Sequence, residues 1–167
     1  LTEGSVDSWG ALYMTDYIKV EGFKVGIATI SFNIFMVVGR FYGDWFRDKM
    51  GVFRLLIILF SVTVLSLIVL INFNSMFSSI LGFAMLGIGG SSIVPISYSL
   101  AGKIKGIDSG VGITIVSVAV YGTFIGAPAA LGLVANSYGV NNVFTPTLLI
   151  FILLLFPLII FRKEFKL

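Results

Sequence analysis

The chain has 167 residues, of which 57% are hydrophobic and only 11% are charged, with a formal net charge of +3. Soluble globular domains carry roughly 25% charged residues, so this composition excludes an ordinary soluble domain. The chain holds no cysteine and no histidine, which excludes disulfides, thiolate metal sites and a histidine base. We therefore expect no cofactor and no metal, and the few clustered basic residues give little support to nucleic-acid binding.

Long apolar runs divide the chain into predicted membrane spans, because a helix needs about 20 apolar residues to cross a hydrocarbon core of about 30 Å. Residues 1–18 are semi-polar and resemble the second half of a span, which predicts a first helix that is truncated. Five full spans are predicted at residues 25–43, 55–71, 76–101, 111–134 and 143–161. The predicted fold class is an all-α polytopic membrane protein with six crossings.

Charge is concentrated in a hinge at residues 39–51, between the first two full spans. The basic residues on this predicted side of the membrane are Arg40, Arg47, Lys49, Arg54, Lys103, Lys105, Arg162, Lys163 and Lys166, whereas the other side holds Lys19 and Lys24. Short loops rich in Lys and Arg stay in the cytoplasm. This asymmetry predicts that loops 44–54 and 102–108 and the C-terminus are cytoplasmic, in a plasma or inner membrane.

Polar side chains form stripes in three of the full spans, at positions four, seven or eleven residues apart, which share one helix face. The stripes are Thr29, Asn33, Arg40 and Asp44; then Ser91, Pro95 and Tyr98; and then Gly110, Thr114, Ser117, Tyr121 and Pro128. We expect these spans and the N-terminal segment to surround a cavity, while spans 55–71 and 143–161 face lipid. The alternative is that the polar groups only bond to neighbouring helices.

Glu3 and Asp7 lie one helical turn apart in the N-terminal segment. If this segment is half of a span, Glu3 lies near the bilayer centre, where an ionised carboxylate is costly. Such a group is expected to line a water-filled cavity, to pair with a cation or to carry a proton. The alternative places both acids in a solvated loop.

Small residues and prolines predict how the helices pack. Gly39 and Gly43, and again Gly122, Gly126 and Ala130, have the four-residue spacing that permits close helix approach. Pro95, Pro128 and Pro157 are expected to break or kink their helices because proline has no N–H to donate. Asp108 is the predicted N-cap of the helix that follows it.

The six crossings and the charged hinge resemble one half of a Major Facilitator Superfamily transporter. That family carries a loop signature, Gly-x-x-x-Asp-Arg/Lys-x-Gly-Arg/Lys-Arg/Lys, whose centre is matched by Asp48-Lys49-Met50-Gly51. Asp44 stands where the first glycine is expected, and Val52-Phe53 replaces the basic pair. Gly39-Arg40-Phe41 and the row from Gly87 to Pro95 look like the second and fourth helices of C-terminal halves, and the pattern of Gly122, Gly126, Pro128 and Gly132 is similar to sugar-permease-like members.

The resemblance implies that the chain supplies helices seven to twelve, with helix seven lacking its first half. It also implies a cytoplasmic gate in which Asp48 pairs with Arg40 or Arg54 and with the helix start at 108–110. The gate residues are then Arg40, Asp44, Asp48, Arg54 and Asp108. The candidates for binding substrate or a proton are Glu3, Asp7, Asn33, Ser91, Tyr98, Thr114, Ser117 and Tyr121.

The predicted function is secondary transport of a small polar solute, by rocking of two six-helix bundles about a central site. The expected partners are the solute, the lipid bilayer and a missing N-terminal six-helix half. The chain is not expected to be an enzyme, because it lacks histidine, cysteine and a strong nucleophile–base pair. The alternative is a membrane scaffold or signalling subunit that keeps the transporter fold without transport.

Overall fold

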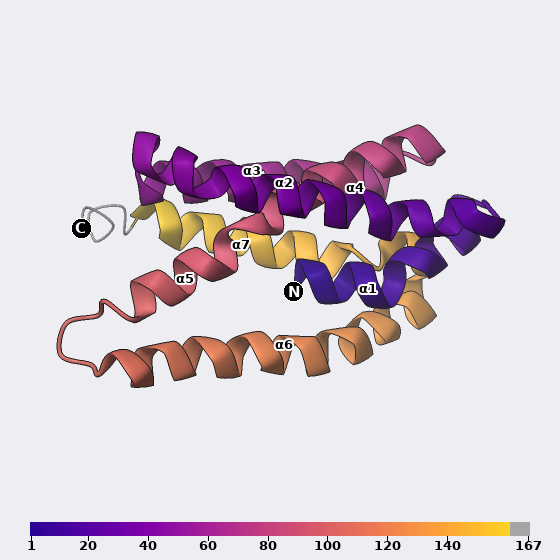
Figure 1. The fold of residues 1–167 in the computed structure, drawn as a ribbon. Coiled ribbons are helices and arrows are strands. Elements are labelled where there is room, and N and C mark those ends of the chain that lie inside the picture. The colour runs from indigo at the N-terminus through magenta and orange to yellow at the C-terminus, as the bar shows by residue number, and fades with distance from the viewer. Residues whose placement is uncertain (161–167) are drawn as a thin grey trace.

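The computed structural model describes residues 1–160, and this part of the chain contains helices and no strands. The helices are α1 (Thr2–Leu12), α2 (Ile27–Met50), α3 (Val52–Asn72), α4 (Met76–Ser91), α5 (Ile93–Ala101), α6 (Ser109–Tyr138) and α7 (Thr145–Ile160). A π-helical turn, Tyr13–Tyr17, extends α1, and short 3-10 segments, Gly22–Gly26 and Val140–Asn142, precede α2 and α7. The helices run back and forth along one common direction (Figure 1).

Among residues 1–160, five helical stretches are long and apolar enough to cross a membrane. They are Gly22–Met50, Val52–Asn72, Met76–Ala101, Ser109–Tyr138 and Val140–Ile160. Each contains or closely overlaps one of the five predicted full spans. The all-α, multi-pass fold class predicted from the sequence is therefore confirmed.

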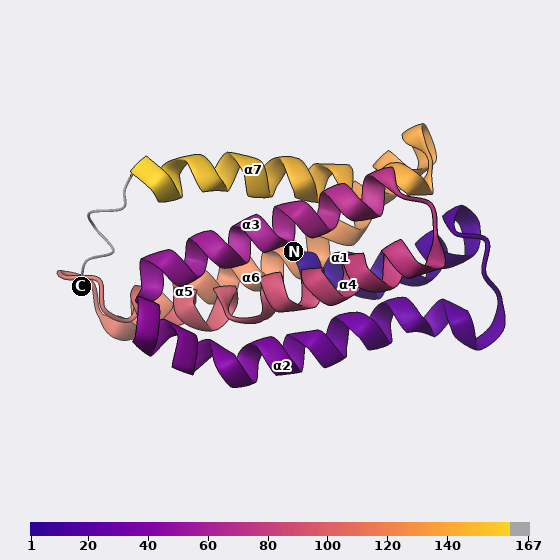
Figure 2. The ribbon, with the colours of Figure 1, turned by 90° about the horizontal axis from the view of Figure 1, so that it is seen from above.

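Three helices pack closely because α4 presents glycines to both of its neighbours. Figure 2 shows α4 running between α2 and α3. A Cβ atom at Gly87 would collide with the backbone of Phe32 in α2, and one at Gly89 would collide with Thr63 in α3. Small residues allow helix backbones to approach closely in membranes, so these glycines determine the spacing of the layer.

Aromatic side chains tie the end of α1 to this layer and to α7. Tyr13 is fully buried, and its hydroxyl donates to the Leu70 carbonyl of α3 at 2.6 Å. Its ring meets the edges of Phe83 and Phe144 at centroid distances of 5.7 and 5.4 Å. Because a buried phenol needs a partner for its hydroxyl, this bond gives the cluster a fixed geometry.

α6 lies on the other side of the molecule, in contact with α1 and α5 (Figure 1). Trp9 of α1 donates from Nε1 to the Pro128 carbonyl of α6 at 3.3 Å, and Gly132 faces the same indole ring. At the other end of α6, Gly112 lies directly against the backbone of Ala101 in α5. Only 11% of the most apolar window of α6 is buried within residues 1–160, against 56% for the α4–α5 stretch.

The structure corrects the prediction of a loop at residues 44–54. Residues 44–50 continue α2, and the only residue between α2 and α3 is Gly51, at a φ of 83°. That left-handed conformation is one that glycine adopts without steric cost. The charged hinge is therefore the last part of a helix followed by a single-residue turn.

A helix break occurs at one of the three prolines. The span at 76–101 is broken at Ser92, three residues before Pro95, which separates α4 from α5. In contrast, α6 and α7 continue through Pro128 and Pro157 without a break.

The prediction of close helix approach is confirmed for Gly39 and Gly43, which face Ser91 and Ser92. It is not supported for Gly122 and Gly126, which have no neighbour within 4 Å among the described residues.

Candidate functional site

The two acids of α1 lie on its uncovered side. The buried face of α1 carries Thr2, Gly4, Ser5, Val6 and Gly10, whereas Asp7 is exposed and Glu3 is half-buried. Within residues 1–160, neither carboxylate forms an ion pair. The two acids are thus available to a ligand, a proton or a partner that approaches this side of α1.

The predicted polar stripes of α2 and α6 bond mainly to their own helices. The Asn33 amide donates to the Thr29 carbonyl at 2.9 Å, Thr114 to the Gly110 carbonyl at 2.8 Å, and Ser117 to the Ile113 carbonyl at 3.0 Å. These bonds follow the i−4 pattern that Ser, Thr and Asn adopt on helices. Tyr121 is 68% exposed and lies on the same open stretch of α6. Within the described part of the chain, none of these side chains forms a hydrogen bond to a neighbouring helix. This counts against the interpretation that they serve only helix packing.

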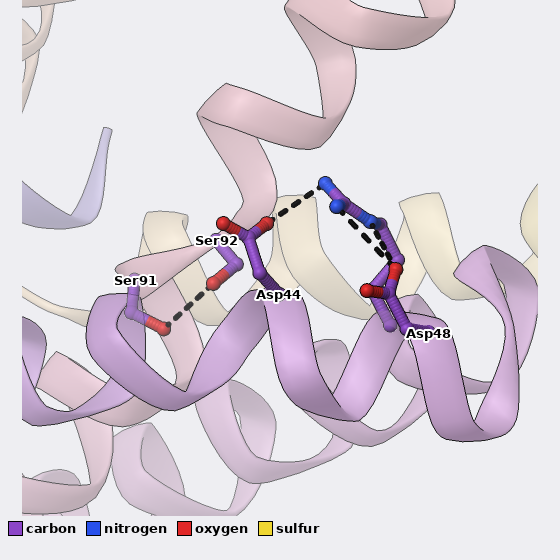
Figure 3. A network of polar contacts seen from close by, with 5 residues as sticks. Asp44, Asp48, Ser91 and Ser92 are labelled. Carbon is purple, nitrogen blue, oxygen red and sulfur yellow. Dashed lines mark hydrogen bonds and ion pairs between the residues drawn. The ribbon is translucent and has the colours of Figure 1, made fainter.

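Arg40 and Ser91 meet at the break between α4 and α5. Pro95 has no N–H, so it cannot make the helical bond to the carbonyl of Ser91. Arg40 of α2 donates from Nε to that carbonyl at 3.3 Å. The Ser91 side chain is buried and donates to the Ile88 carbonyl at 2.7 Å, with the Ser92 hydroxyl 3.4 Å away (Figure 3). Arg40 and Ser91 therefore act together as parts of a helix joint.

The acids of the hinge share one guanidinium. Asp44 pairs with Arg47 at 2.8 Å, and Arg47 also reaches Asp48 at 3.4 Å, as the dashed lines in Figure 3 show. The predicted partners of Asp48 are Arg40 or Arg54, and neither pair occurs among residues 1–160. Arg47 is absent from the predicted gate, although its spacing of three residues from Asp44 is one that brings helical side chains together.

A cavity of about 500 Å³ separates the hinge from α5. It is lined on one side by Arg47, Asp48, Gly51 and Val52, and on the other by Ile96, Ser99, Leu100 and Lys103. Lys103 is thus a cation that faces the hinge across the cavity, and it is missing from the predicted gate. Tyr98, a predicted site residue, is half-buried on α5 and does not line this cavity.

Asp108 occupies the predicted N-cap position of α6. Its Oδ1 accepts a hydrogen bond from the Gly110 N–H at 2.9 Å. A carboxylate here satisfies a backbone donor that the helix itself leaves free. The connection 102–108 lies at the same end of the molecule as the turn between α2 and α3, while the connection between α1 and α2 lies at the opposite end (Figure 1). The basic clusters Arg47–Arg54 and Lys103–Lys105 therefore share one end, as predicted; Arg162, Lys163 and Lys166 lie outside the described residues.

Comparison with known proteins identifies the family. The sequence profile described as Major Facilitator Superfamily matches residues 5–167. The chain belongs to the Major Facilitator Superfamily. The Asp44–Arg47–Asp48 group lies on the final turns of α2, in the segment whose sequence resembles the loop signature described above.

Curated relatives are similar over most of the chain. A membrane protein named MosC from Rhizobium meliloti is 29% identical over 142 residues, which are 85% of this chain and 35% of that protein. An uncharacterized MFS-type transporter of Yersinia pestis is 27% identical over 136 residues, 81% of this chain and 35% of its own length. An uncharacterized transporter of Sinorhizobium fredii, y4wD, is 24% identical over 137 residues, or 82% and 36% of the two chains. The chain thus spans about a third of the length of these relatives. No solved structure matches it significantly.

Proposed function

We propose that this chain is the C-terminal six-helix bundle of a secondary transporter that moves a small polar solute by alternating access. Membership of the superfamily and the likeness to transporters support membrane transport. The observation that carries the finer proposal is the open face of α6. This helix is the least covered of the five candidate spans, yet it presents Thr114 and Tyr121 on its exposed surface. The hydroxyls of Thr114 and Tyr121, which lie on this face among exposed apolar side chains such as Ile115, Val118 and Ile125, support a water-lined cavity or a protein partner beside it.

A second six-helix bundle would complete the translocation path. The chain covers about a third of its curated relatives, and an isolated bundle encloses no path across the membrane. In the proposed mechanism, the two bundles rock about a site near the bilayer midplane. The basic clusters at 47–54 and 103–105 support an orientation with this end in the cytoplasm, in a plasma or inner membrane.

Glu3 and Asp7 are the proposed groups for proton coupling or for binding a polar solute. A carboxylate without a cationic partner inside a membrane is costly when ionised, so a proton or a bound cation would stabilise it. Asn33, Thr114, Ser117 and Tyr121 would contribute hydrogen bonds to the solute. The buried Ser91 and the half-buried Tyr98 would influence the site through α4 and α5.

Uptake by vesicles that contain the full protein tests the proposal. Sugars, amino acids, organic acids and other solutes are screened with and without a proton gradient. Gradient-driven accumulation of one class is expected, and Glu3→Gln is expected to abolish it, with Asp7→Asn as the second target. Asp16→Asn, an exposed acid in the turn after α1, is the control and should retain uptake.

Two results would contradict the proposal at different levels. Accumulation that survives Glu3→Gln would show that this carboxylate does not carry the coupling proton. A folded protein that takes up none of the solutes would argue against transport itself and would favour a scaffold or signalling role.

A further inference from the structure

An apolar groove of about 270 Å³ runs between α2 and α3 near the charged end of the molecule, with α4 as its floor. Its walls include Val38, Tyr42 and Phe46 of α2 and Leu55 and Ile58 of α3. The hydroxyls of Ser91 and Ser92 in its floor are buried and contact each other, and that of Ser91 also bonds to the Ile88 carbonyl. Apart from the Tyr42 hydroxyl, the groove offers almost no free hydrogen-bonding group, which argues against a polar solute as its occupant.

Two exposed cations are next in the chain to residues that line one end of this groove. Met50 and Leu55 line that end, and Lys49 and Arg54 are their neighbours in the chain, on either side of the Gly51 turn. Both basic side chains are exposed, and Lys49 Nζ lies 4.8 Å from the centre of the Trp45 ring. The acids of this region, Asp44 and Asp48, are both paired with Arg47.

We propose that this groove binds an anionic phospholipid, with an acyl chain against α2 and α3 and the phosphate between Lys49 and Arg54. The apolar walls match the chain, and arginine and lysine are the side chains that bind phosphate oxygens. Trp45 and Tyr42 have the amphipathic rings that lie at the level of lipid headgroups. The inference rests on the membrane location of the superfamily fold and not on which solute is transported.

Two features favour this occupant over the others. A groove of about 270 Å³ with apolar walls has room for part of one acyl chain. The charged residues around the Gly51 turn are three cations, Arg47, Lys49 and Arg54, against two acids, Asp44 and Asp48, so their net positive charge favours an anionic headgroup over a zwitterionic one. The groove therefore fits part of a single acyl chain below a net positive rim.

Binding to the delipidated full protein, measured by native mass spectrometry with phosphatidylglycerol and phosphatidylcholine of the same chain length, tests the proposal. We expect phosphatidylglycerol to bind more tightly, and the double variant K49Q/R54Q to lose roughly fivefold in affinity for each charge removed. The matched control, K103Q/K105Q, removes two charges from the same end of the molecule but none beside the groove, and should keep the preference. Ile58→Trp, which fills the groove, should weaken binding of both lipids.

Any one of four binding results would overturn the proposal. These are an unchanged preference for phosphatidylglycerol in K49Q/R54Q, an equal loss in K103Q/K105Q, intact binding in Ile58→Trp, and displacement of the lipid by inorganic phosphate alone. A helix from a second bundle is distinguished by labelling: a cysteine at position 58 should react with a lipid-soluble maleimide in the assembled protein. Protection from that reagent would show that protein covers the groove and would also overturn the proposal.

Discussion

Arg40 supplies to α4 the hydrogen bond that a backbone N–H at position 95 would make in an uninterrupted helix. Its Nε donates a hydrogen bond to the Ser91 carbonyl, which Pro95 leaves without a backbone partner. The sequence indicated both residues separately, Arg40 as a gate cation and Pro95 as a helix breaker. Their link could not be predicted, because it joins two helices through a contact between residues 40 and 91, far apart in the chain.

Removal of the arginine should destabilise the joint. Arg40→Met leaves the Ser91 carbonyl without its partner, which costs about 1–2 kcal/mol in a partly buried position. Pro95→Ala restores an N–H at position 95, so the double variant R40M/P95A should regain most of that loss. Thermal unfolding of the full protein in detergent gives the three stability changes for a double-mutant cycle.

Additive effects in this cycle would show that Arg40 does not act through the Ser91 carbonyl.

The ion pair of Arg47, unlike the contact of Arg40, could be predicted from the sequence. Its pairing with Asp44 follows from the spacing of three residues, so inspection of the sequence could have found it.

At the scale of elements, α4 owes its position between α2 and α3 to glycines on two faces. The same four-residue spacing occurs at Gly39 and Gly43 and at Gly122 and Gly126, yet only the first pair contacts a described helix. Spacing alone cannot distinguish them, because it says which residues share a face but not which neighbour covers that face. The single-residue turn at Gly51 was missed for a related reason, since charged residues on the last turns of a helix look like a loop.

An added methyl group should reveal which glycines are necessary. Gly87→Ala places a Cβ against the Phe32 backbone and should destabilise the protein by about 1–3 kcal/mol through overpacking. Gly26→Ala is the control, because its nearest neighbour is the end of the flexible Ile30 side chain at 3.9 Å. Thermal unfolding should show a large decrease in stability for Gly87→Ala and little change for Gly26→Ala. Similar values for the two variants would contradict the role given to α4.

At the scale of the whole molecule, the apolar runs predicted the five spans because the demands of a bilayer on length and composition are strict. The candidate site was less predictable. The sequence showed where the polar stripes and the acids of α1 lie along the chain. The cavity between the hinge and Lys103, however, depends on the direction that α5 takes after Ser92. A change of direction at one residue moves a whole helix, and sequence periodicity does not record that direction.

Asp48 lines this cavity opposite α5, so its substitution tests the proposed gating role. If Asp48 holds the proposed gate closed, Asp48→Ala should weaken closure of this end of the molecule and raise the accessibility of a cysteine at position 99, which lines the same cavity. Exposed ion pairs contribute up to about 1 kcal/mol, so a shift of up to about fivefold in labelling rate is expected. Labelling by a water-soluble maleimide in vesicles measures this shift, with expression level as the check on folding. An unchanged labelling rate would argue against a gating role for Asp48.

The contrast between the two connections at this end has a practical consequence for protein engineering. Gly51 links α2 and α3 alone, in a conformation that few other residues adopt, so an inserted domain there would force the two helices apart. Residues 102–108 between α5 and α6 are mostly exposed and longer, and such segments tolerate insertions. Insertion of a fluorescent reporter near Lys105 is therefore the way to follow this protein in living cells.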